Sequence, residues 1–282
     1  MQSSITLDAP AKINIGLRVF PKREDGYHNI KSIFKSVSLC DSLTVSLLPE
    51  KDTCIVECQQ MLLPKDNTFT KAYKAFCVLT GIHEGVSVKV NKRIPSGGGL
   101  GGGSSDASSF IQSVDELLGT RLRNEDFANI ASHVGSDVFF FAHAKGQVGY
   151  TALVEGRGER VKELAIQRDF AVLLLLPGLA VLTKEAYALV DSWQEKEEDT
   201  FTDWGSEYKK IASAWSFKND FTLPVQSKYN RIKIALDTLK SAGADFADMS
   251  GSGSTVFGVF ENRKHAIEVQ NRIGADWQAF LV

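Results

Sequence analysis

The sequence predicts an α+β protein, because segments with the period of a strand and segments with the period of an amphipathic helix occur along one chain. Val86–Val90 alternates apolar and polar residues as a strand does, and apolar residues from Ala107 to Leu118 recur at helical spacing. Phe170–Leu176 is a continuous apolar run, which is typical of a strand buried on both faces. The 282 residues are enough for two domains or one large one.

The hydrophobic content of 43% and the charged content of 23% are ordinary for a soluble globular protein. The formal net charge of −2 gives no general attraction to nucleic acid or anionic membranes. Met1–Ile5 has neither the basic nor the apolar region of a signal peptide, and the longest apolar run, Phe170–Leu176, is too short to span a bilayer. The four cysteines match no zinc pattern. We therefore expect a cytoplasmic protein, monomeric or homodimeric, with no nucleic acid, membrane or structural metal as partner.

The first strand is expected over Lys12–Phe20, which alternates strictly. Its spacing puts Lys12 and Asn14 on one face, about 7 Å apart, as site residues or as an ordinary solvated face. Asp25-Gly26 predicts a turn, from which Tyr27 and His28 emerge. On its own, His28 fits a surface or capped histidine as well as a site residue.

Further strands and one helix precede the glycine-rich centre of the chain. Asp66 or Asn67 suits the N-cap of the helix, and Gly81 suits its end. We expect strands at Ser32–Leu39, Ser42–Leu48 and Cys54–Cys58, and a helix at Phe69–Thr80.

A glycine loop lies between the strand at Val86–Val90 and the helix that ends at Gly119. Six of the seven residues from Gly97 to Gly103 are glycine, with Ser104 or Ser105 as the expected N-cap. Backbone N–H groups of such a loop at a helix N-terminus form a site for phosphate.

Four interpretations of the glycine loop compete. A P-loop would need lysine after the last glycine, where this chain has Ser104. A dinucleotide fingerprint would need a second strand soon afterwards, whereas Asn124–Val134 has the pattern of a helix. A nucleotide loop of another kinase fold and a flexible linker remain, and a linker does not usually join a clean strand to a clean helix.

One carboxylate, Asp137, stands directly before the apolar residues Val138–Phe141. Either Ser136 or Asp137 caps a short buried helix, or Asp137 has a chemical role. A buried carboxylate is costly unless it is paired, and Lys12 would be a suitable partner.

The last third of the chain alternates strands and helices. Thr183 and Tyr187 are four residues apart and share one face of a helix, either towards a site or towards the core. Gln194–Thr200 is acidic and polar, as an exposed loop is. We expect helices at Thr183–Trp193, Lys228–Ser241 and Arg263–Ile273, a strand–loop–strand at Asp248–Phe260, and a final strand at Trp277–Val282.

The motif from Pro95 to Ala107 resembles the central signature of the GHMP kinase superfamily, which phosphorylates galactose, homoserine, mevalonate and related small molecules. The loop in Asp248–Phe260 resembles a further motif of that family, and Ala9–Ile15 with Asp25-Gly-Tyr-His resembles the branch whose acceptor is 4-diphosphocytidyl-2-C-methyl-D-erythritol. The resemblance implies a two-domain α+β GHMP kinase fold, with a nucleotide and substrate domain at 1–160 and a ferredoxin-like domain at 161–282.

The resemblance also implies a reaction, in which ATP with Mg²⁺ phosphorylates the 2-hydroxyl of that acceptor in the non-mevalonate isoprenoid pathway. It implies Lys12 and Asp137 as catalytic residues, although Ser136 and Phe139 replace the alanine and proline of the family beside the aspartate. For the acceptor it implies Asn14, Tyr27, His28, Thr183 and Tyr187; for the nucleotide it implies Asn67, Lys92, Pro95, Gly97, Gly98, Gly99, Gly101, Gly102, Gly103, Ser104, Ser105 and Asp106.

Two alternatives to this function stay open. One is a homoserine or mevalonate kinase, against which the Asp25-Gly-Tyr-His segment argues. The other is a GHMP relative that binds a ligand without catalysis, against which the presence of both Lys12 and Asp137 argues.

Overall fold

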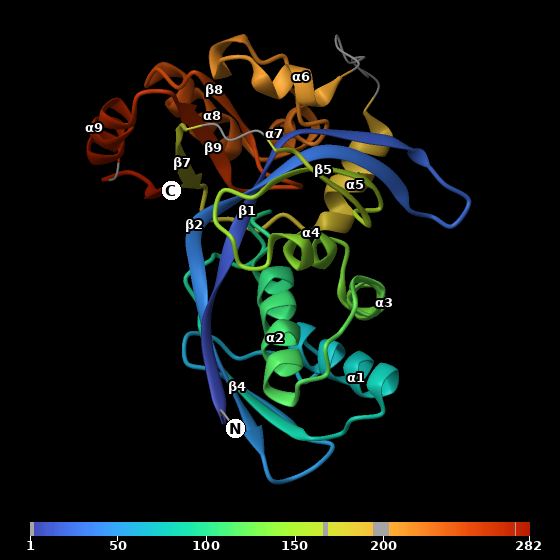
Figure 1. The fold of residues 1–282 in the computed structure, drawn as a ribbon. Coiled ribbons are helices and arrows are strands. Elements are labelled where there is room, and N and C mark those ends of the chain that lie inside the picture. Colours follow the sequence, from blue (N-terminus) through green and yellow to red (C-terminus); the bar gives the residue numbers. More distant parts are fainter. Residues whose placement is uncertain (1–2, 166–168, 194–202, 274) are drawn as a thin grey trace.

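The computed structural model describes residues 3–165, 169–193, 203–273 and 275–282, and the acidic segment expected at Gln194–Thr200 lies outside them. Two sheets organise the described residues (Figure 1). The larger is six-stranded, with the order β3-β4-β2-β5-β6 and β1 paired to β2. Its strands are β1 (Ser4–Lys22), β2 (His28–Leu48), β3 (Cys54–Cys58), β4 (Gly85–Asn91), β5 (Thr151–Gly156) and β6 (Arg160–Glu163).

β2 is one continuous strand, and the expectation of two separate strands at Ser32–Leu39 and Ser42–Leu48 is wrong. The reason is that β1 pairs with β2 on both sides of an irregularity opposite Pro10 and Ala11, where the register skips Ser38 and Leu39 of β2. A second irregularity lies at Gly16, which has φ of 67° and breaks the strict alternation expected through Phe20.

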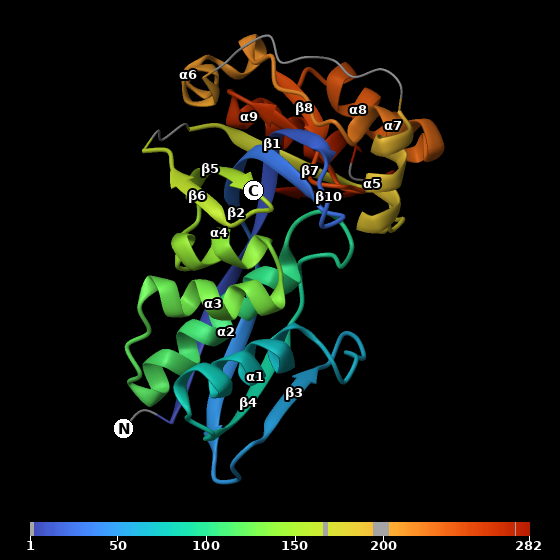
Figure 2. The ribbon, with the colours of Figure 1, turned by 90° about the vertical axis from the view of Figure 1, so that its right-hand side faces the viewer.

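Four helices lie beside the larger sheet: α1 (Thr68–Thr80), α2 (Gly102–Leu118), α3 (Asn124–Val134) and α4 (Asp137–Ala144). Figure 2 shows α1, α2 and α3 gathered over the lower part of β1 and β2. Phe69, Phe76, Phe110 and Ile130 of these helices share a core with Val88 of β4. This core fixes the first turn of α2 relative to the sheet, and the glycine loop precedes that turn.

The second sheet is four-stranded and antiparallel, with the order β10-β7-β9-β8. The order and the sequence of strands and helices are those of the expected ferredoxin-like unit. Its elements are β7 (Ala171–Leu176), α5 (Thr183–Ser192), α6 (Trp204–Lys209), η1 (Ala212–Ala214), α7 (Thr222–Lys228), α8 (Asn230–Ser241), β8 (Phe246–Met249), β9 (Val256–Phe260), α9 (Arg263–Ile273) and β10 (Gln278–Leu281). The division at residue 160 stays a prediction, since β6 crosses it.

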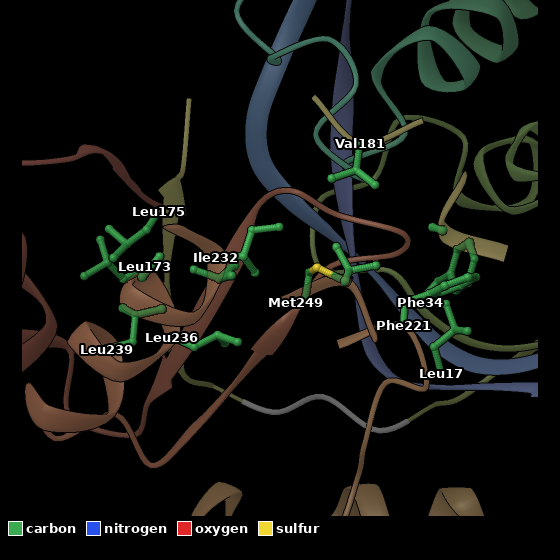
Figure 3. Packing of buried hydrophobic residues seen from close by; sticks show 14 of the residues in the cluster. Leu17, Phe34, Leu173, Leu175, Val181, Phe221, Ile232, Leu236, Leu239 and Met249 are labelled. Carbon is green, nitrogen blue, oxygen red and sulfur yellow. The ribbon is translucent and has the colours of Figure 1, made fainter. Parts of the chain in front are cut away.

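Both faces of β7 are buried, as the continuous apolar run predicts. Val172 and Leu174 face a core that includes Ile13 of β1, so the second sheet packs against the first. On the other face, Figure 3 shows Leu173 and Leu175 beside α8 in a core that continues to Phe34 of β2. The two cores join the sheets and therefore hold the site residues of both in one arrangement. In the described ranges, no helix has the length and apolar character needed to cross a membrane.

Candidate active site

The predicted glycine loop is the floor of a pocket of about 460 Å³. The pocket also receives side chains from β1, α4 and α5, and its last wall is Gly251–Gly253 of the loop between β8 and β9. The predicted residues that line it are Lys12, Asn14, Lys92, Pro95, Gly97, Gly98, Gly99, Gly101, Gly102, Gly103, Ser104, Asp137, Thr183 and Tyr187.

The glycine loop becomes helix at Gly101, which has φ of 71°. A Cβ atom there would lie 3.0 Å from a ring carbon of Phe141 and 3.1 Å from Cγ of Lys12, so both conformation and space require glycine. α2 begins at Gly102, and the expectation of Ser104 or Ser105 as N-cap is wrong. Since the first N–H groups of a helix have no partner within it, this end of α2 suits an anion.

Lys12 and Asp137 form an ion pair in the pocket, with 3.3 Å between Nζ and Oδ2. The Lys12 side chain is 4% exposed and that of Asp137 is 29% exposed, so the ammonium is fixed while the carboxylate stays accessible. Lys12 Nζ also donates to Oδ1 of Asn14 at 2.6 Å and to the carbonyl of Gly99 at 3.0 Å. Lys12 and Asn14 are both buried, which overturns the solvated-face alternative.

A chain of hydrogen bonds orients Asn14. Its Nδ2 donates to Oγ of Ser32 at 3.1 Å, and that hydroxyl donates to the carbonyl of Gly16 at 2.6 Å. The amide oxygen of Asn14 therefore faces the Lys12 ammonium. The arrangement leaves Lys12 a cation with three oxygen partners, suited to offset negative charge on a nearby group.

Asp137 begins α4 and Ser136 precedes it, without a side-chain cap hydrogen bond. Ser136 therefore occupies the N-cap position without capping through its side chain, and the carboxylate of Asp137 pairs with Lys12. Gly158 of the β5–β6 turn packs on Ser136, since a Cβ atom at Gly158 would lie 2.9 Å from Cβ of Ser136. Phe139 lies in the first turn of α4.

The loop between β8 and β9 approaches the glycine loop backbone to backbone. The Thr255 N–H donates to the Gly98 carbonyl at 3.2 Å, and Oγ of Ser250 donates to the Gly99 carbonyl at 2.9 Å. Asn219 holds the same loop from outside, because its Nδ2 donates to the carbonyls of Met249 and Gly251 at 2.7 and 2.8 Å. The two small-residue motifs of the sequence thus form one surface.

Tyr187 forms the apolar end of the pocket. Its ring packs edge-on against Phe221 and stacks on His28, with 4.9 Å between the centroids of each pair. Burial, and then the charge of Asp137, raises the pKa of Tyr187 to about 12, so the phenol is neutral. Thr183 lines the same end and lies 3.3 Å from the Ser252 hydroxyl.

Five predicted residues are not among those that line the pocket. Asn67 caps α1 by accepting from the N–H groups of Phe69 and Thr70, which confirms the capping alternative. His28 is buried behind Tyr187, with Nδ1 2.8 Å from the Phe20 carbonyl. Tyr27 is exposed under the guanidinium of Arg157, and Ser105 and Asp106 are buried in α2. A ligand role for all five stays a prediction.

Lys92 also lines the pocket, and it pairs with Asp41 and Asp106. Burial raises the pKa of Asp106 to about 7, although Lys92 opposes the shift. Asp41, Ser32 and Asn219 were not predicted from the sequence, because they act through residues distant in the chain. An acidic residue inside the apolar pattern of β2 was the one available signal for Asp41.

Comparisons with known proteins show the family to which the chain belongs. The model of the GHMP kinases N terminal domain matches residues 67–145, and that of the GHMP kinases C terminal domain matches residues 203–279. A 4-diphosphocytidyl-2-C-methyl-D-erythritol kinase of Treponema pallidum (strain Nichols) is 37% identical, over 97% of this chain and 96% of the relative. One of Thermodesulfovibrio yellowstonii is 35% identical, over 93% and 92%.

A solved structure extends the similarity to three dimensions. The crystal structure of a 4-(cytidine 5'-diphospho)-2C-methyl-D-erythritol kinase superposes with a TM-score of 0.81 at 30% identity, and the match covers 98% of each chain.

Proposed function

Because this chain belongs to the 4-diphosphocytidyl-2-C-methyl-D-erythritol kinases of the GHMP kinase family, we propose that it transfers the γ-phosphoryl group of ATP to the 2-hydroxyl of that diphosphocytidyl substrate. The observation that carries the proposal is the Lys12–Asp137 pair, which lies in one pocket with the glycine loop and with Tyr187. A phosphate floor, an acid–base pair and an aromatic wall are what a nucleotide, a hydroxyl and a cytosine require.

In the proposed reaction the protein positions its two substrates and offsets charge. The glycine loop and the first turn of α2 bind the phosphates of ATP through backbone N–H groups. Asp137 accepts the proton of the 2-hydroxyl while the hydroxyl oxygen forms a bond to the γ-phosphorus. The bond from that phosphorus to the β–γ bridging oxygen breaks, and ADP leaves. Lys12 holds the Asp137 carboxylate in place through their ion pair and offsets the charge that develops on the transferred group.

We assign the two ends of the pocket to the two substrates. Lys92 and the loop from Pro95 to Ser104 contact the nucleotide, with Asn67, Ser105 and Asp106 supporting that end. Tyr187 stacks on cytosine, and Thr183, Asn14, His28 and Tyr27 belong to the acceptor end. The stacking of His28 on Tyr187 supports a platform of fixed orientation.

Mg²⁺ is part of the proposal and would supply positive charge that offsets the negative charge of the nucleotide's phosphates. We infer that the nucleotide's phosphates and water hold it, as Mg²⁺ usually retains several waters. Within the described ranges, no three His, Cys, Asp or Glu side chains form a group that could hold a metal ion. A cytoplasmic location, a monomer or homodimer, and the absence of nucleic-acid and membrane partners remain parts of this proposal.

The experiment that tests the function measures ADP release from the purified protein with Mg²⁺-ATP and one acceptor at a time. The acceptors are the diphosphocytidyl-methylerythritol, homoserine, mevalonate and galactose, with a sample that lacks acceptor as control. We expect release with the cytidylyl acceptor only. Release with another acceptor would discard the pocket assignment, and ATP binding without release would favour a ligand-binding relative.

A further inference from the structure

We propose that Asp41 is a positioning residue of the nucleotide end of the pocket, which holds Lys92 and the start of the glycine loop in one arrangement. The inference rests on the proposed function only in naming ATP as the ligand. Asp41 belongs to β2 and does not line the pocket, so its effect on a ligand passes through the residues it contacts.

One carboxylate oxygen of Asp41 accepts hydrogen bonds from two backbone N–H groups. The side chain is fully buried, and Oδ1 accepts from the N–H groups of Arg93 and Ile94, at 2.5 and 2.8 Å. These two residues directly precede Pro95, where the glycine loop begins. Asp41 therefore attaches the residues just before the loop to the middle of the larger sheet.

The other oxygen of Asp41 pairs with Nζ of Lys92, which reaches Oδ2 of Asp106 at 2.8 Å as well. Asp106 lies in α2, beyond the loop, whereas Asp41 holds the residues before it. The Lys92 ammonium thus joins the two ends of the loop from Ile94 to Gly101. It also lies 3.4 Å from the place of a Cβ atom at Gly102, which lines the pocket.

A carboxylate is specifically required at position 41. An asparagine has one acceptor oxygen and one amino group, so it could still accept from Arg93 and Ile94 but would turn N–H groups towards the Lys92 ammonium. Asp41→Asn therefore keeps the backbone attachment and removes the ion pair, at nearly the same volume. Because the amide N–H groups would repel the Lys92 ammonium while Asp106 still attracts it, we expect Lys92 to move from Asp41 towards Asp106.

The test compares Asp41→Asn with Glu207→Gln, a matched control outside the pocket. Glu207 is 2% exposed, accepts from the Ser216 N–H at 2.7 Å and pairs with Lys210 at 2.6 Å, so it repeats the backbone-plus-lysine pattern. The primary readout is the affinity for a non-hydrolysable ATP analogue with Mg²⁺, by calorimetry without acceptor. The melting temperature and the KM values for ATP and acceptor complete the data.

We expect Asp41→Asn to weaken binding of the analogue by about tenfold or more, with KM for ATP rising in parallel and KM for acceptor changing by less than about threefold. Glu207→Gln should lower the melting temperature without weakening the binding of the ATP analogue. Analogue affinity that is unchanged in Asp41→Asn, or weakened equally in both variants, would overturn the proposal. Because binding is measured without acceptor, a wrong acceptor assignment leaves this test intact.

A second measurement keeps the proposal testable if Asp41→Asn does not fold. Lys92→Met removes the bridge and leaves the two backbone hydrogen bonds of Asp41 in place. We expect faster amide hydrogen exchange over residues 96–103 in this variant, because the loop loses the joint between its ends. Exchange equal to that of the unmodified protein would contradict the role of Lys92 as the joint, and with it the proposal.

Discussion

Replacement of Gly99 by alanine should separate the two loops that form the phosphate end of the pocket. A Cβ atom at Gly99 would lie 2.0 Å from the carbonyl oxygen of Ser250, which is backbone and cannot rotate away. Gly99 also has φ of 75°, a conformation that costs an L-residue about 1–2 kcal/mol. The carbonyl of Gly99 accepts hydrogen bonds from Lys12 and Ser250, so its displacement would disturb the position of the Lys12 ammonium.

The size of the effect follows from the required displacement. Real Cβ contacts are rarely shorter than 3.0 Å, and the predicted one is 2.0 Å, so the loops must part by about 1 Å. A misplacement of about 1 Å can lower a rate about 10²-fold. Overpacking adds about 1–3 kcal/mol of destabilisation to the strain of the backbone.

Gly97→Ala is the matched control, because Gly97 has φ of 69° and the nearest heavy atom to its added Cβ would be 3.5 Å away. Both variants carry the backbone strain, and only Gly99→Ala carries the clash. We expect kcat to fall about 10²-fold in Gly99→Ala and less than about tenfold in Gly97→Ala. The free energy of unfolding, measured in urea, should be about 1–3 kcal/mol lower in Gly99→Ala than in Gly97→Ala. Equal kcat values for the two variants would refute the reasoning.

Two further predictions concern the two ends of the pocket. Tyr187→Ala should raise KM for the cytidylyl acceptor more than KM for ATP, whereas Tyr187→Phe should retain the stacking; equal losses for both substrates would contradict a cytosine platform. Burial raises the pKa of Asp106 to about 7, and its unfolded value is about 4, so the folded protein binds the additional proton between these values. The free energy of unfolding should therefore fall as pH rises from about 4 to 7. The urea midpoint should fall less steeply over this range in Asp106→Asn than in the unmodified protein. Asp248, with a pKa raised to about 6 by burial, accounts for part of the slope that remains in the variant. An unchanged slope would mean that Asp106 is ionised throughout.

The sequence predicted the elements that rest on local pattern. Asn124–Val134 and Arg263–Ile273 are helices with the expected bounds, and Cys54–Cys58 is a strand with the expected bounds. The two-sided burial of β7 followed from its continuous apolar run. These features depend on neighbours within a few residues, which the sequence displays directly.

Features that depend on distant partners were beyond local reasoning. The start of α2 at Gly102 depends on the packing of Gly101 against Phe141 and Lys12, which a search for serine caps does not consider. The continuity of β2 depends on its pairing with β1.

The candidate site divides in the same way. Lys12 and Asp137 were predicted as partners because a buried carboxylate needs a cation, and the structure brings them together. Asp41 of β2 pairs with Lys92, which follows β4, and Ser32 of β2 binds Asn14 of β1. No spacing in the sequence connects the members of either pair.

The most direct test of the proposed chemistry is the rate of ADP release from Asp137→Asn with saturating Mg²⁺-ATP and the cytidylyl acceptor. The variant keeps the size of the side chain and removes the proton acceptor. The account predicts a fall in kcat of about 10²-fold or more, with the affinity for ATP within about threefold of that of the unmodified protein. Lys12→Ala should show a similar fall in kcat. Near-normal turnover in Asp137→Asn would contradict the assignment of Asp137 as the base.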